Sequence, residues 1–130
     1  MIEHRKDGRP PEQGLDLHTR AALIDFVDIL SVAESITARS KDAYDRDRVL
    51  QFAAETVIVR IAEAMNRMSA DFKAAHPKVP WDGVRGLRNI SARHYDLVNT
   101  DRVWQTIEQG LPMIGRLIGA IPPAGGFPLR

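Results

Sequence analysis

Side chains that could take part in catalysis or in phosphate binding are concentrated in one short stretch, residues 81–96, with the sequence WDGVRGLRNISARHYD. It contains Arg85, Arg88, Arg93, His94 and Tyr95, in a chain that has only four histidines and two tyrosines. Arginine presents a planar fork that matches phosphate, a tyrosine ring stacks on bases, and histidine titrates near neutral pH. Arginine with histidine suffices for metal-independent RNA cleavage, because one group moves the 2′-OH proton and the other neutralises the phosphorane.

Helical geometry places part of this set on one face. At about 100° per residue, Arg88 and Tyr95 fall on one line, and Arg85 lies within about 60° of it. An arginine pair and a phenol would therefore share a face. His94 points about 120° away from Arg88, toward the apolar side of the segment.

A purely structural interpretation of the same residues stays open. His94 falls with Leu87, Ile90 and Leu97, as a packed histidine would. The arginines are equally explained as a solvated face, paired with Glu55 or Glu63 of the preceding helical segment. Tyr95 would then be an ordinary packing residue.

Other site chemistries have little support in the sequence. The histidines His4, His18, His76 and His94 have no partner at a metal-ligand spacing such as HExxH. No GxxxxGK[ST] loop is present, and Ser91 is not set in a nucleophile elbow. We therefore expect neither a metal nor a cofactor.

Composition narrows the class of protein. The chain has 130 residues, a formal net charge of +1 and no cysteine, which excludes a grossly basic nucleic-acid coat and a disulfide framework. No stretch approaches the roughly 18 apolar residues of a membrane span. The polar first 14 residues do not resemble a secretory signal, and we expect a cytoplasmic location.

Apolar periodicity predicts four helices and no strand. They cover about 16–37, 43–75, 81–98 and 100–118, with Asp16 as an N-cap and Pro112 as a kink or as the start of a separate last turn. Short connections between amphipathic helices favour an all-α fold, an antiparallel four-helix bundle forming a single domain over 15–120. Residues 1–14 are expected to be a flexible segment, and 121–130 a Pro/Gly-rich tail. The long second stripe hints at self-association.

An ordered series of short motifs resembles the HEPN superfamily, specifically its HepT type, over about residues 20–118. The motifs are His76–Pro77, Pro80–Trp81, Arg88–Asn89, His94–Tyr95 and Val103–Trp104. The broad family signature is Arg, four to six residues, then His, and five residues separate Arg88 from His94. The narrower HepT form is Arg, four residues, His, any residue, Tyr. Matched on Arg88 and Tyr95, its histidine position holds Arg93, which stays protonated and cannot act as a base.

The resemblance implies a homodimer whose Arg and His side chains line a shared cleft. It also implies a metal-independent endoribonuclease toxin of a HepT/MntA-like toxin–antitoxin system that cuts cellular RNA. Arg88 would stabilise phosphate and His94 would perform acid–base chemistry, with Arg85, Asn89 and Arg93 binding substrate. A cognate MNT-type nucleotidyltransferase would neutralise the toxin, by transfer of AMP to Tyr95.

A second hypothesis follows from Arg93. The chain would then be a catalytically degenerate HEPN module that binds RNA or the nucleotidyltransferase without cutting. A purely structural helical adaptor ranks last, because it leaves the cluster of Arg, Asn, His and Tyr unexplained.

Overall fold

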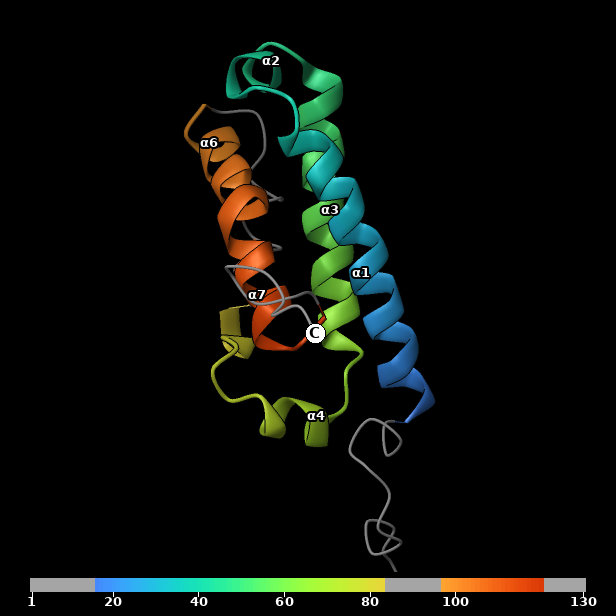
Figure 1. Cartoon of the computed structure of the whole chain (residues 1–130). Coiled ribbons are helices and arrows are strands. Elements are labelled where there is room, and N and C mark those ends of the chain that lie inside the picture. Colours follow the sequence, from blue (N-terminus) through green and yellow to red (C-terminus); the bar gives the residue numbers. More distant parts are fainter. Residues whose placement is uncertain (1–15, 84–96, 121–130) are drawn as a thin grey trace, which may run out of the picture.

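A computed structural model describes residues 16–83 and 97–120, which form helices and turns and contain no strand. The predicted all-α class is confirmed. The residues form three rods, α1, α3 and a rod that begins with α6, with short helices at the two ends of the bundle (Figure 1). The expected N-terminal segment 1–14 and the Pro/Gly-rich tail 121–130 lie outside the described residues.

Helices α1 (Leu17–Thr37) and α3 (Arg48–Asn66) form an antiparallel pair (Figure 1). α1 begins as predicted at Asp16, whose carboxylate accepts a hydrogen bond from the Thr19 amide at 2.6 Å. The fully buried Thr19 hydroxyl oxygen in turn accepts from the Ser69 amide at 2.8 Å. This bond ties the start of α1 to the chain that follows α3.

The single helix predicted over 43–75 is wrong, since three helices occupy that region. They are α2 (Lys41–Asp45), α3 and α4 (Ala70–Ala75). The cause is local capping: side chains of Ser40, Asp47 and Ser69 accept hydrogen bonds from backbone amides of the helix that follows each of them. Such caps start new helices. The apolar stripe nevertheless continues across the break between α3 and α4, because Met68 and Phe72 are buried with the α3 residues.

The last rod runs from α6 (Leu97–Gln105) through a π-helical segment (Thr106–Gly110) into α7 (Leu111–Leu117). It begins three residues earlier than the predicted start at residue 100. Pro112 lies in the first turn of α7, as one of the two alternatives predicted. A proline inside an α-helix clashes with the carbonyl four residues before it, and the wide π turn directly before α7 changes the backbone at that carbonyl, Glu108.

Only the two ends of the third predicted helix, 81–98, belong to the described residues. Its first residues, Trp81–Gly83, form a 3₁₀ turn instead of an α-helix, and residues 97–98 belong to α6. Residues 84–96 lie outside the described part of the chain.

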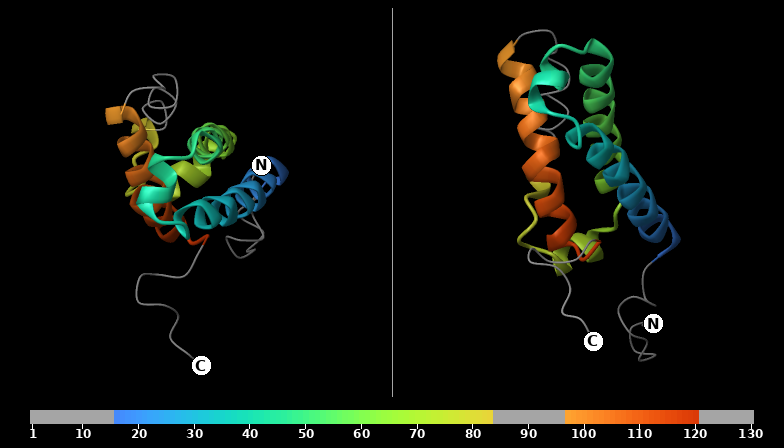
Figure 2. Two further views of the ribbon diagram at one scale, coloured as in Figure 1. Left: turned by 90° about the horizontal axis from the view of Figure 1, so that it is seen from above. Right: turned by 45° about the horizontal axis from the view of Figure 1, so that its top comes forward.

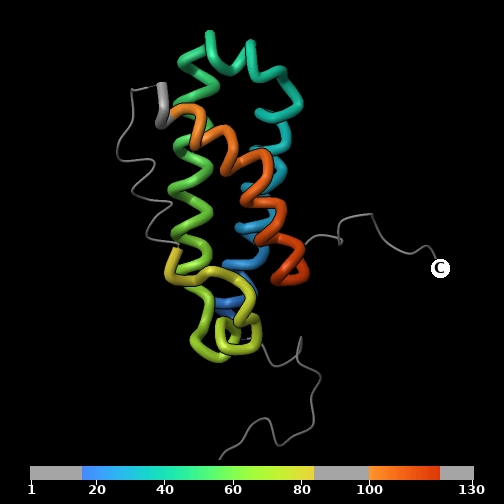
Figure 3. The backbone as a smooth tube through the Cα atoms, turned by 90° about the vertical axis from the view of Figure 1, so that its left-hand side faces the viewer, coloured from blue at the N-terminus to red at the C-terminus, as the bar shows by residue number. Residues whose placement is uncertain are grey.

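The core lies where the three rods meet. The α6–α7 rod contacts both α1 and α3, and Figure 2 shows the three rods from above and tilted. The largest fully buried side chains come from all three rods and from α2, and include Phe26, Tyr44, Ile58, Ile61, Met65, Val103, Ile107 and Leu111. α2 closes one end of the bundle and α4 lies at the other (Figure 3 shows the same path from the side).

Candidate functional site

The six residues predicted to carry chemistry all lie in 84–96, outside the described residues. They are Arg85, Arg88, Asn89, Arg93, His94 and Tyr95. Their mutual geometry is therefore untested. The structure does describe the residues directly before and after this segment, and the outward face of α3.

Trp81 fixes the chain directly before the segment. Its indole N–H donates to the His76 carbonyl at 2.9 Å, and its ring meets Phe72 edge-on, with ring centroids 6.3 Å apart. The Lys73 ammonium lies 5.9 Å from the Trp81 ring centroid. The Pro80–Trp81 and His76–Pro77 motifs thus form one small anchor beneath the bundle.

His76 has a structural role in this anchor. Its Nδ1 lies 2.9 Å from the Phe72 carbonyl oxygen, and its ring packs on the Phe72 ring with centroids 4.3 Å apart. A ring nitrogen bonded to a carbonyl must carry the proton, so Nδ1 is the donor.

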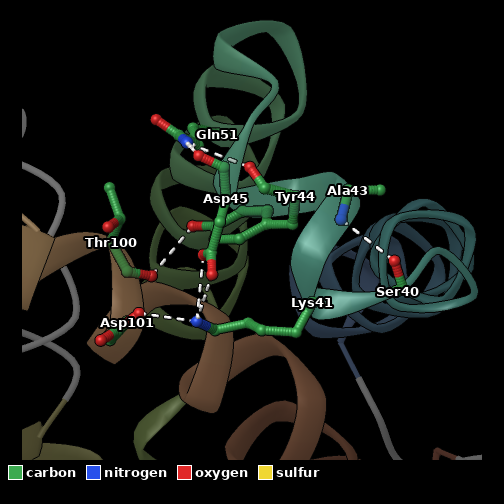
Figure 4. Close-up of polar contacts among 8 residues, drawn as sticks. All are labelled: Ser40, Lys41, Ala43, Tyr44, Asp45, Gln51, Thr100 and Asp101. Atoms are coloured by element: carbon green, nitrogen blue, oxygen red, sulfur yellow. Dashed lines mark hydrogen bonds and ion pairs between the residues drawn. The ribbon is translucent and has the colours of Figure 1, made fainter.

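The chain directly after the segment is fixed by α2 (Figure 4). The Tyr44 hydroxyl donates to the Thr100 carbonyl at 3.0 Å, and the Tyr44 ring packs on Trp104 at a centroid distance of 4.9 Å. Tyr44 is fully buried. Burial raises the pKa of its phenol, and the negative charges of Glu55, Asp45 and Asp101 raise it further.

A charged contact on the surface joins the same two helices. Lys41 Nζ lies 3.0 Å from a carboxylate oxygen of Asp45 and 2.7 Å from one of Asp101 (Figure 4). Hydrogen bonds to Asp101 and then Asp45 raise the pKa of the Lys41 ammonium. We call Lys41, Tyr44, Thr100, Asp101 and Trp104 the α2–α6 clasp.

The outward face of α3 carries a shallow groove lined by Phe52, Glu55, Thr56, Val59, Arg60 and Glu63. Both carboxylates that the sequence offered as arginine partners, Glu55 and Glu63, line this one groove. Phe52 is 42% exposed there, and the Arg48 guanidinium lies 5.2 Å from its ring centroid. Among the described residues that line the groove, two are carboxylates and one is a guanidinium.

No group of three or more His, Asp or Glu side chains that could hold a metal ion occurs in residues 16–83 and 97–120. Across the same ranges, the helices are too short or too polar to cross a membrane.

Comparison with known proteins assigns this helical bundle to a family. Residues 27–121 match the family model described as Ribonuclease HepT-like. The chain belongs to this family, and the resemblance drawn from its motifs to the HepT type of the HEPN superfamily is confirmed. The match includes all of residues 84–96.

Several curated relatives align over most of this region. "Putative RNase MJ1380" of Methanocaldococcus jannaschii is 28% identical over 91 residues, covering 67% of this chain and 84% of the relative. "Putative RNase TTE0752" of Caldanaerobacter subterraneus subsp. tengcongensis is 28% identical, covering 68% and 79%. "Probable ribonuclease HepT" of Thermococcus cleftensis is 29% identical, covering 52% and 62%. No solved structure matches the chain significantly.

Sequence reasoning missed most of the clasp. Lys41, Tyr44 and Asp101 were not singled out, whereas Trp104 entered through a motif. A local signal did exist for α2, since Ser40 has the residue type of an N-cap. The pairing of Tyr44 with Thr100 has no local signal, because 56 positions separate them.

Proposed function

We propose that this chain is a metal-independent endoribonuclease, the toxin of a HepT/MntA-like toxin–antitoxin system. The observation that carries the proposal is the family match over residues 27–121, which contains Arg88 and His94 at the broad family spacing. The ribonuclease names of the relatives support the activity. RNA and a second copy of the chain are the expected partners, with the Arg and His side chains of both copies lining a shared cleft.

The proposed reaction uses the 2′-OH of RNA. His94 takes the 2′-OH proton, the oxygen attacks phosphorus, and the 5′-oxygen leaves and takes a proton from water, which gives a 2′,3′-cyclic phosphate and a 5′-hydroxyl end. Arg88 neutralises the charge that develops on the phosphorane oxygens. Arg85, Asn89 and Arg93 hold the flanking phosphates and bases.

Regulation would come from a cognate MNT-type nucleotidyltransferase that transfers AMP to Tyr95. The chain has two tyrosines, and the other one is a poor acceptor. Tyr44 has no exposed surface, and its hydroxyl is bonded to the Thr100 carbonyl. An AMP group on Tyr95 would add negative charge and bulk beside the arginines and block phosphate entry.

The test is an RNase assay in EDTA that compares the wild-type protein with Arg88→Ala, His94→Ala and Arg93→His. We expect wild-type cleavage and loss of activity in the Arg88 and His94 variants, with folding and dimer size unchanged. Cleavage by a clean His94→Ala preparation would remove the assigned base. The AMP step is tested by mass spectrometry after incubation with the nucleotidyltransferase and ATP: Tyr44→Phe should be modified and Tyr95→Phe should not.

One observation favours a second candidate, a HEPN module that binds RNA or the nucleotidyltransferase without cutting. Arg93 occupies the histidine position of the narrower HepT signature. Under this alternative the wild-type chain is inactive, Arg93→His gains activity, and induction without the partner leaves growth unchanged.

A further inference from the structure

The contacts that hold the chain before and after residues 84–96 differ in the sequence separation of the residues that they join. Before the segment, Trp81 is held within one local stretch, since His76, Phe72 and Lys73 lie at most nine positions away. After the segment, α6 is held by α2, a helix more than fifty positions earlier in the chain. Trp81 also packs against the hydrophobic core, whereas, among the described residues that flank the segment, the polar contacts between distant parts of the sequence lie after it.

The hydrogen bond of Tyr44 acts on the backbone. Its hydroxyl donates to the carbonyl of Thr100, three residues after α6 begins at Leu97. A carbonyl oxygen has two lone pairs, so this bond adds to the helical one. The acceptor is main chain, and any movement of the first turn of α6 must therefore stretch the bond.

Two further contacts restrict the same turn. The Tyr44 ring packs on Trp104, one helical turn after Thr100. At the surface, Lys41 Nζ lies 2.7 Å from the Asp101 carboxylate. Figure 4 shows the contacts of Tyr44 with Thr100 and of Lys41 with Asp101, both made from α2. Together the three contacts hold the start of α6 against α2.

We infer that Tyr44 is a positioning residue: through the α2–α6 clasp it fixes the helix start into which the chain runs directly from His94 and Tyr95. The effect of this positioning on catalysis rests on the proposed function. Along the sequence, His94 precedes Thr100 by six positions, whereas Arg88 and Arg85 precede it by twelve and fifteen. Release of the clasp should therefore disturb acid–base chemistry more than phosphate binding.

The test compares Tyr44→Phe, which deletes the hydroxyl and keeps the ring, with Ala21→Gly as a control. Ala21 is an exposed residue of α1, and glycine there lowers stability through the helix backbone alone. In the RNase assay, well below both melting temperatures, Tyr44→Phe should lower kcat by about tenfold to a hundredfold, since small misplacements of catalytic groups have effects of this size. KM should stay within about twofold of wild type, and Ala21→Gly should change neither constant.

A second readout does not depend on cleavage. The pH titration of the His94 ring is followed by NMR, with its signals assigned by their absence in His94→Ala. Tyr44→Phe should shift the midpoint or the ring shifts of His94, and Ala21→Gly should leave both in place. Lys41→Met acts on the same turn from the surface and should give a smaller change of the same kind, which keeps the test available if Tyr44→Phe does not fold.

The outcomes separate the two proposals. If wild type does not cut RNA but the clasp variants alter the His94 titration, the proposed function fails and the positioning role stands. If wild type cuts and Tyr44→Phe retains the same kcat, KM and His94 titration, the positioning role is overturned. An equal response of Ala21→Gly and Tyr44→Phe also overturns it, because the effect would then be general destabilisation.

Discussion

Replacing Thr19 by valine tests whether a single buried hydrogen bond joins α1 to the chain after α3. Valine has the shape of threonine and a similar helix propensity, so the substitution exchanges a hydroxyl for a methyl group and removes the contacts of that hydroxyl with the Ser69 amide and with the Asp16 carboxylate. The Ser69 amide, which donates to this hydroxyl at 2.8 Å, loses its acceptor. Thr19 has no exposed surface, so water cannot readily replace the lost oxygen.

The size of the effect follows from the burial. A buried donor left without a partner costs about 1–3 kcal/mol, and we expect about 2 kcal/mol here. Thr19→Ser is the matched control, because it keeps the hydroxyl and loses one buried methyl group, at a cost of about 1 kcal/mol. The expected order of stability is therefore wild type, then serine, then valine, although valine is the most apolar of the three.

The assay is urea unfolding followed by circular dichroism at 222 nm, with the urea dependence of the free energy required to be the same in all three proteins. A loss of about 2 kcal/mol corresponds to a roughly thirty-fold larger unfolding constant. If valine is as stable as serine or more stable, the hydrogen bond has no net value and hydrophobic contact governs this position.

Three further predictions address caps and charges. Asp47→Ala should destabilise by about 1 kcal/mol in thermal unfolding, because Asp47 caps α3 through the amides of Val49 and Leu50; no loss would show that the cap is dispensable. Lys41→Met should cost under about 1 kcal/mol, since its ion pairs are partly exposed, and added salt should narrow the gap from wild type. The raised pKa of Tyr44 contributes stability that is present below about pH 10, the ordinary tyrosine value, and is lost as pH rises above it; absorbance titration at 295 nm of a Tyr95→Phe protein should show no phenolate until the fold opens, and ionisation of the folded protein near pH 10 would contradict the burial.

The sequence predicted the helical rods well because amphipathic periodicity is a local property. α1 begins at its predicted cap, Asp16, and the last rod ends within a residue of its predicted end. The same property produced the main error. The stripe from Leu50 to Phe72 stays in helical register across the break between α3 and α4, and so it conceals the Ser69 cap at that break.

The candidate site was predictable only as a set of residue types. Arg88 and His94 stand out through their spacing, and the family match spans both positions. The parts that hold the neighbouring chain could not be found this way. Tyr44 meets Thr100 because α2 and α6 come together at one end of the bundle, and that meeting depends on the packing of the whole fold.

The clasp also has a consequence for the order in which the protein is made and folded. α1 and α3 are joined by the short connection 38–47, so they can pair as soon as residue 66 has left the ribosome, at a low entropic cost of loop closure. Tyr44 must wait for Thr100 and Trp104, more than fifty residues later. Residues 85–94 are therefore synthesised before the helix that follows them can be held by α2, and the α2–α6 clasp forms later than the pairing of α1 with α3.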